Sequence, residues 1–116
     1  MIRAKTSGDR RYDDRHPGTG LIARIEDYEV EVLDVSIGGL KLARPEGKLF
    51  QLQNKLDFVL VSTHWPEMSP APVRGVVRAL THDWMAVQFT RPTYNLMKCV
   101  SRHVGTLLWG QKPYGY

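Results

Sequence analysis

The feature that most constrains the fold of this chain is a series of short runs in which apolar and polar residues alternate, separated by residues typical of turns. Successive side chains of an extended strand point to opposite faces, so this alternation predicts strands with one face buried and the other in water. The clearest run covers 28–35, where apolar residues alternate with Glu29 and Glu31. We predict six strands, at about 21–25, 28–35, 39–44, 56–60, 73–80 and 85–89.

Six short strands joined by turns at this spacing predict a small antiparallel β-barrel, an arrangement that leaves few strand edges exposed. One connecting turn lies at 44–47, which contains Pro45 and Gly47. The segment 65–72 contains three prolines, and because proline has no N–H to donate within a central ladder, we expect an exposed loop there. The predicted fold class is therefore mainly β.

Beyond the last predicted strand, the spacing of the apolar residues changes to that of a helix. We expect a C-terminal α-helix over about 92–110, with Thr90 as its N-cap and Pro92 in its first turn. We expect its apolar face to plug or cover the barrel, the alternative being a groove for a partner. That face consists of Leu96, Met97, Val100, Val104, Leu107 and Leu108.

The length and charge of the chain limit its organisation and its partners. At 116 residues it is long enough for one domain with a core but too short for two. We divide it into a flexible N-terminal arm over 1–17, which shows no periodicity, and the barrel with its helix over 18–116. The net charge of +4 favours anionic partners without singling out long nucleic acid.

Cysteine content and hydropathy indicate the compartment. The single cysteine, Cys99, excludes an internal disulfide and a zinc site built on cysteines, which fits a reducing cytoplasm. No run approaches the roughly eighteen apolar residues of a membrane span, and the first residues lack the apolar centre of a signal peptide. We therefore expect a cytoplasmic location, or the cytoplasmic face of the inner membrane if the chain is part of a synthase.

A polar, glycine-rich turn at 34–39 joins two of the predicted strands. Asp34 supplies a carboxylate acceptor, and Ser36 supplies a hydroxyl that can donate or accept a hydrogen bond. Gly38 and Gly39 allow a positive φ or the close approach of another molecule. The same residue types suit an ordinary structural turn, which is the alternative interpretation.

Upstream of this turn, three arginines stand close together, at Arg10, Arg11 and Arg15. A guanidinium can form two parallel hydrogen bonds with a phosphate, pair with the O6 and N7 atoms of guanine, or stack on a base. The alternative is a solvated run of charges that Asp13 and Asp14 partly neutralise.

Taken together, these two clusters resemble the two-part motif of the PilZ domain, a bacterial receptor module for cyclic di-GMP. The matching residues are Arg11 and Arg15, followed by Asp34, Ser36 and Gly39. The resemblance covers most of the chain, although only these two motifs are specific. It implies a six-stranded β-barrel with a C-terminal helix, the architecture that the strand pattern predicts independently.

The resemblance also implies roles for the motif residues. Arg11 and Arg15 would contact phosphates and the edges or faces of guanine, while Asp34 would accept hydrogen bonds from guanine N1–H and N2–H. Ser36 would bond to a phosphate or a base. Gly39, with Gly38 before it in the same turn, would let the ligand approach the backbone.

Arg10 precedes the arginine pair, at a position that in this family influences whether one ligand or a stacked pair is bound; an arginine suits the stacked pair. Since the arginines lie on the predicted arm and Asp34 on the barrel, we expect ligand binding to order the arm and create a surface for a partner or fused effector. Exopolysaccharide synthesis or motility would be the controlled process. The segment 99–111 is similar to the PilZ region of bacterial cellulose synthase catalytic subunits.

Other patterns indicate packing rather than chemistry. The four histidines lie far apart, and Ser36 and Asp34 have no nearby base in the sequence, so we expect no metal site, no cofactor and no enzymatic activity. Cys99, Trp65 and Trp109 suit packing. Two other classes remain as alternatives: a basic β-barrel that binds RNA or single-stranded DNA, and a PilZ-like scaffold that acts only through protein contacts.

Overall fold

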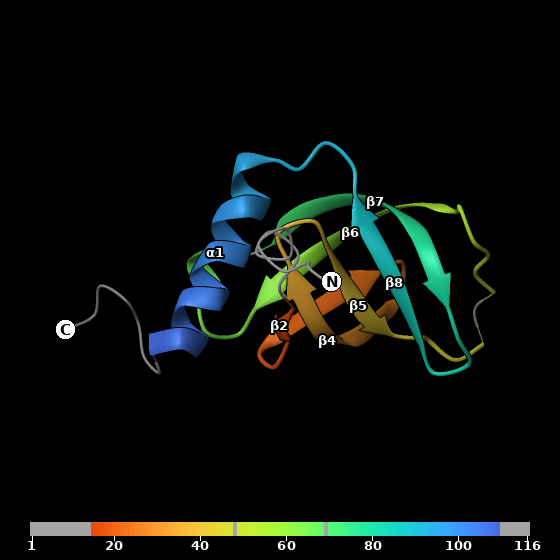
Figure 1. The fold of residues 1–116 in the computed structure, drawn as a ribbon, viewed down its shortest axis with the longest axis horizontal. Helices are drawn as coiled ribbons and strands as arrows, with labels where there is room; N and C mark the ends of the chain where they lie inside the picture. Colours follow the sequence, from red (N-terminus) through yellow and green to blue (C-terminus); the bar gives the residue numbers. More distant parts are fainter. Residues whose placement is uncertain (1–14, 48, 69, 110–116) are drawn as a thin grey trace, which may run out of the picture.

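A computed structural model describes residues 15–47, 49–68 and 70–109 of the chain. Within these ranges it contains strands, one short 3-10 helix and one α-helix (Figure 1). In chain order they are β2 (His16–Pro17), β3 (Leu21–Ile25), β4 (Tyr28–Ser36), β5 (Gly39–Ala43), β6 (Lys55–Ser62), η2 (Pro66–Met68), β7 (Ala71–Leu80), β8 (Trp84–Phe89) and α1 (Tyr94–Trp109).

Six of the strands close into an antiparallel barrel, with α1 packed beside it (Figure 1). The order around the barrel is β4, β3, β6, β7, β8 and β5, and the pairing of β4 with β5 completes the ring. The predicted fold class, a six-stranded antiparallel barrel with a C-terminal helix, is confirmed. The structure adds one strand, β2, which pairs with β4.

The predicted N-terminal arm over 1–17 lies outside the described residues as far as residue 14. Its last two residues, His16 and Pro17, form β2 and lie opposite Val35 and Asp34 of β4. The chain is therefore paired to the barrel wall from His16 onward.

Closure of the barrel depends on β4, because the two halves of this strand have different neighbours. Residues 28–31 pair with β3, and residues 32–36 pair with β5. The register of the second ladder shifts between Val32 and Asp34, which makes Leu33 an extra residue in β4, a β-bulge. A bulge bends a strand and increases its twist, so β4 can leave one neighbour and join another.

Apolar side chains from all six barrel strands fill the interior, and α1 covers it. The helix contributes buried Leu96, Cys99 and Val100, and Met97 and Val104 pack against the same cluster. For these residues the predicted apolar face of the helix is confirmed. The largest fully buried apolar side chains of the barrel are Leu21, Ile25, Val35, Leu40, Leu42, Leu60, Val73, Val77, Met85 and Val87.

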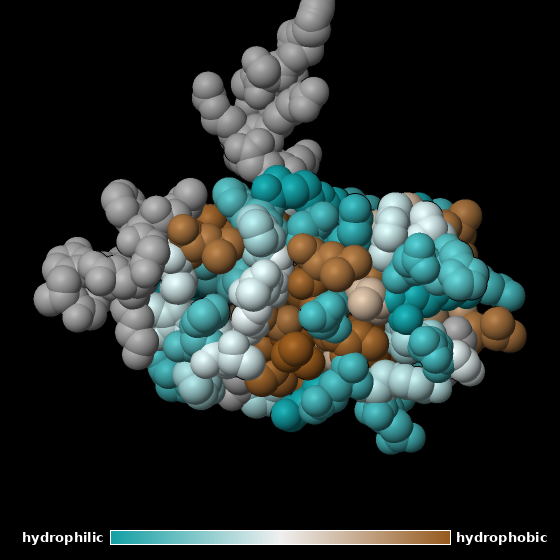
Figure 2. Space-filling model, turned by 90° about the horizontal axis from the view of Figure 1, so that it is seen from below, coloured by the Kyte–Doolittle hydropathy of each residue, from teal (hydrophilic) through white to brown (hydrophobic). Residues whose placement is uncertain are grey.

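The outer wall of the barrel is not uniformly polar. Figure 2 shows the face that lies at the bottom of Figure 1, where apolar side chains gather near the centre and hydrophilic ones surround them. On the outer side of β3 and β6, Ile22 lies opposite Val61, and both are half-buried. The bulge residue Leu33 is 39% exposed. Apolar surface therefore lies on the β3–β6 wall and reaches β4.

The expectation of an exposed proline-rich loop over 65–72 is wrong at both ends. Trp65 is buried, and its indole N–H donates a hydrogen bond of 2.8 Å to the Thr106 hydroxyl. Pro72 lies within β7, opposite Val59 of β6. Pairing of β7 with β8 begins only at Gly75, so the first residues of β7 have a free edge on which proline's missing N–H is not needed.

The helix starts later than predicted, and Thr93 rather than Thr90 caps it. The Leu96 N–H donates a hydrogen bond of 3.1 Å to the Thr93 hydroxyl, as an N-cap requires. Thr90 lies three residues before this cap, outside the helix, and its own N–H donates to the carbonyl of Arg74, which prolongs the contact between β7 and β8. Pro92 therefore precedes the cap.

We expect Gly39→Ala to destabilise the fold by about 1–3 kcal/mol, the usual cost of overpacking. A methyl group at this position would overlap the carbonyl oxygen of Val87, forcing β5 away from β8. Urea unfolding measures the change in unfolding free energy. Ile37→Ala is the matched control in the adjacent turn, because Ile37 is 53% exposed and its truncation should change stability by only about 0.5 kcal/mol. Equal stability of Gly39→Ala and the wild type would contradict this packing.

Candidate functional site

A carboxylate flanked by two cations lies on the outer surface of β4 and β5. The Arg15 Nη1 is 3.0 Å from the Asp34 Oδ1, and the Lys41 Nζ is 3.6 Å from the Asp34 Oδ2. The side chains of Arg15, Asp34 and Lys41 are 47%, 21% and 33% exposed. The cluster is therefore open to solvent, and a ligand can reach both signs of charge.

Strand pairing brings these three residues together. Pro17 of β2 lies opposite Asp34, which places Arg15 beside the carboxylate. Lys41 of β5 is the direct cross-strand partner of Asp34 on the other side. Two of the predicted site residues, Arg15 and Asp34, are thus in contact although nineteen positions separate them.

Two residues of this cluster were missed by the sequence analysis, Lys41 and Trp84. The Lys41 Nζ lies 4.3 Å from the centre of the Trp84 ring, a cation–π contact. They meet because β5 pairs with β8 in a register that sets Lys41 opposite Ala86, two residues from Trp84. The alternation at 39–44 indicates that Lys41 faces outward, but no local signal gives the register of strands so far apart in sequence.

Ser36 stabilises the turn between β4 and β5. Its hydroxyl donates to the carbonyl of Gly39 and accepts from the N–H of Gly38, each at 3.3 Å. The side chain is only 3% exposed. In this structure the hydroxyl is therefore engaged within the turn, next to the charged cluster.

The two glycines of the turn serve packing between strands. Among the described glycines, those with positive φ are Gly20 and Gly47, so neither Gly38 nor Gly39 uses this freedom. Gly39 is buried against β8, where a side chain would overlap the backbone. The close approach that this glycine permits is thus the approach of β8.

The remaining predicted site residues, Arg10 and Arg11, lie outside the described residues. Of the predicted set, the structure places Arg15 and Asp34 in contact and Ser36, Gly38 and Gly39 in the adjoining turn.

A buried histidine connects α1 to the strand that follows Arg15. The His103 Nε2–H donates a hydrogen bond of 2.8 Å to the carbonyl of Pro17, and His103 is fully buried. Its Nδ1 has no hydrogen-bond partner among the described residues. Burial lowers the pKa of His103, the Pro17 hydrogen bond opposes this shift, and the nearby His64 and His16 add to it. The neutral ring therefore holds β2 to the helix.

The described residues show no group of three or more histidine, cysteine or acidic side chains that could hold a metal ion. Burial raises the pKa of the Cys99 thiol to about 11, so this side chain is a protonated thiol in the core. Within the part of the chain that the structure describes, no helix is long and apolar enough to cross a membrane.

Comparisons with known proteins give a fold but no family. No protein-family model matches the sequence, and no curated protein matches it significantly. Among solved structures, the chain resembles the crystal structure of an uncharacterized Legionella protein with a TM-score of 0.58 and 11% identity. The match covers 84% of this chain and 96% of the other. At this identity the likeness shows a shared barrel fold alone.

We expect the stability of the protein to fall as the pH drops below about 6.5. The pKa of His103 is lower in the folded than in the unfolded chain, where it is near 6.5, so the unfolded state takes up more protons on acidification. The stability contributed by the neutral ring is thus present above this pH and lost below it. Urea unfolding across this range measures the slope.

The variant His103→Gln keeps an N–H donor without titrating, and should show a smaller loss of stability on acidification than the wild type. His82→Gln is the control, because the His82 side chain is fully exposed. Equal slopes in the wild type and His103→Gln would show that His103 does not cause the pH dependence.

Proposed function

We propose that this chain is a receptor domain for cyclic di-GMP of the PilZ type. The observation that carries the proposal is the contact between Arg15 and Asp34 at 3.0 Å, because it joins the two halves of the motif on one surface. A chance likeness in sequence would give no reason for these two residues to meet.

The chemistry of the cluster suits this ligand. Cyclic di-GMP presents two phosphates and two guanine bases. Asp34 offers two acceptor oxygens for the N1–H and N2–H of guanine, and the Arg15 guanidinium can form paired hydrogen bonds with a phosphate or with guanine O6 and N7. Lys41 adds a second cation, and Trp84 offers a ring on which a base can stack.

The ion pair in the free protein does not oppose binding. Exposed ion pairs contribute only about 0–1 kcal/mol, whereas a hydrogen bond to a charged group contributes about 1.5–3 kcal/mol. Exchange of the Arg15–Asp34 contact for ligand contacts is therefore favourable. The proposed site also includes Arg10 and Arg11, with Ser36, Gly38 and Gly39 at its rim.

The proposed receptor is not an enzyme and acts on a partner or on a domain fused to it. By the resemblance, the controlled process is exopolysaccharide synthesis, with cellulose as one product, or motility. The ligand is cyclic di-GMP as a single molecule or a stacked pair, in a protein that works in the cytoplasm or at the inner membrane through its partner.

Isothermal titration of cyclic di-GMP into the full chain tests the proposal. We expect Asp34→Ala and Arg15→Ala each to weaken binding by about ten- to a hundred-fold, since each removes hydrogen bonds to a charged group. Arg24→Ala is the matched control: Arg24 also forms an exposed ion pair, with Glu29 at 2.8 Å, but on β3 and the first half of β4. Its affinity should equal that of the wild type.

GTP and cyclic di-AMP serve as ligand controls. Absence of heat with cyclic di-GMP from a folded protein would refute the receptor function and favour a scaffold that acts through protein contacts. Equal affinity for all three nucleotides, or no effect of Asp34→Ala, would refute the assigned site.

A further inference from the structure

A second cationic surface lies on the wall of the barrel opposite the candidate site. In the ring of strands, β7 is separated from β4 by two strands on either side. Two adjoining hollows, of about 410 and about 470 Å³, lie between the β6–β7 wall and the connection from β8 to α1. Both are lined by Asp57, Arg74 and Arg91, so they form one groove, which we name the β6–β7 groove.

The β6–β7 groove carries an excess of positive charge. Lys55, Arg74 and Arg91 line it, against a single carboxylate from Asp57. The Arg74 Nε is 3.3 Å from the Asp57 Oδ1, and the two side chains are 66% and 77% exposed. Lys55 and Arg91 form no ion pair with a described carboxylate, and the sequence contains no acidic residue after Asp83. Two cations of the groove thus lack a counter-charge among the described residues.

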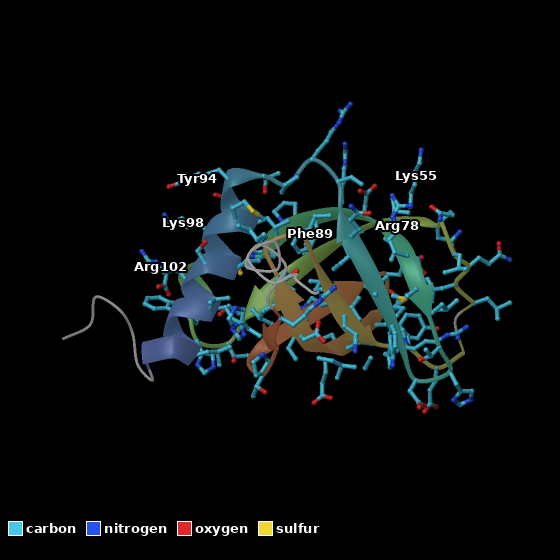
Figure 3. All side chains as sticks on the ribbon, in the orientation of Figure 1. Lys55, Arg78, Phe89, Tyr94, Lys98 and Arg102 are labelled. Atoms are coloured by element: carbon cyan, nitrogen blue, oxygen red, sulfur yellow. The ribbon has the colours of Figure 1, made fainter. Side chains whose placement is uncertain are left out.

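Arg91 is presented by a backbone in an unusual conformation. Its φ of 51° lies in the left-handed region, which is uncommon for residues other than glycine. The connection is fixed on both sides of it, by the bond from the Thr90 N–H to Arg74 and by the Thr93 cap of α1. Figure 3 shows Lys55 projecting from the upper surface of the barrel, the side on which this connection runs.

Among the described residues, the rest of the groove lining is apolar apart from Thr90 and Thr93, and no aromatic ring in it is exposed. Its lining includes Leu56, Val76, Pro72 and Val73, and its one aromatic residue, Phe58, is buried. Proteins that bind single-stranded nucleic acid stack bases on exposed aromatic side chains, which this groove lacks. An acidic peptide suits the groove better, because its carboxylates can pair with the cations while apolar side chains on the same face of the peptide rest on the apolar part of the lining.

We propose that the β6–β7 groove binds an extended acidic peptide segment of a partner protein. Carboxylates of the peptide pair with Lys55, Arg74 and Arg91, and apolar side chains between them rest on the lining. The inference does not depend on the proposed nucleotide, because the two surfaces lie on opposite walls and share no residue.

Fluorescence anisotropy tests the groove with a labelled peptide in which pairs of glutamates alternate with pairs of leucines, so that each face of the extended chain carries both residue types. The peptide has ten residues, the length of β7. Matched peptides carry lysine in place of glutamate or serine in place of leucine. We expect the Glu–Leu peptide to bind more tightly than both, and more weakly at about 0.15 M than at about 0.01 M salt, since screening shortens the range of the charges. No nucleotide is present, so the result is independent of the receptor proposal.

The double variant Arg74→Ala/Arg91→Ala should weaken binding of the Glu–Leu peptide about tenfold or more, as expected for the loss of two charged hydrogen bonds. Arg24→Ala/Lys98→Ala removes the same charge elsewhere and should leave the affinity within about twofold; in Figure 3, Lys98 projects from the side of α1 away from the barrel. Circular dichroism checks that both variants fold.

Three results would overturn the proposal. One is absence of binding by the Glu–Leu peptide at about millimolar protein, a limit that corresponds to roughly 4 kcal/mol of binding free energy. Another is an equal loss of affinity in the two double variants, which would show that only net charge matters. The third is displacement of the peptide by a thymidine oligonucleotide of equal charge that binds more tightly, which would indicate a nucleic-acid surface instead.

Discussion

The pairing of β4 on both of its edges is the constraint on which both the barrel and the candidate site depend. The strand closes the ring only because the bulge at Leu33 lets its second half join β5. The same change of register turns Asp34 outward between Pro17 and Lys41, its neighbours on the two flanking strands. A straight β4 would leave the ring open and would place Asp34 in a different register. Closure and the charged cluster therefore have one structural cause.

The second constraint is the bond from His103 to Pro17. An imidazole that is buried and neutral offers one donor, and here that donor meets the carbonyl of the strand next to Arg15. A buried polar group without a partner costs about 1–3 kcal/mol, so rupture of this bond inside the core is unfavourable. The helix consequently covers the barrel and also fixes the edge strand that presents Arg15. The sequence shows His103 on the predicted helix, but its partner lies 86 positions away and only the tertiary fold supplies it.

Local patterns predicted the barrel because alternation and turn residues are short-range signals. The strand over 21–25 and the part of the strand over 28–36 that precedes the bulge follow that alternation closely. What depends on register could not be predicted. The contact of Lys41 with Trp84 requires the pairing of β5 with β8, which no local pattern specifies. Pro72 was misassigned to a loop because proline is excluded only from strand positions whose N–H faces a neighbouring strand. Whether an edge of β7 is free at Pro72 depends on the pairing of the whole sheet, which the local sequence does not show. Arg15 and Asp34 were selected as candidate site residues because they match a known motif, and the pairing of β2 with β4 explains why they are in contact.

Binding at one cationic surface can change the affinity at the other only through a structural element that both surfaces affect. The free energy of that element must change when either surface is occupied. The helix α1 adjoins both surfaces. It begins directly after Thr93, which lines the β6–β7 groove, and its His103 bonds to Pro17, two residues beyond Arg15. A ligand that displaced β2 through Arg15 would act on the strand to which His103 is bound, and the N-terminal end of the same helix follows the groove residue Thr93. Because such coupling is reciprocal, any factor by which a nucleotide changes the affinity for an acidic peptide must equal the factor by which the peptide changes the affinity for the nucleotide.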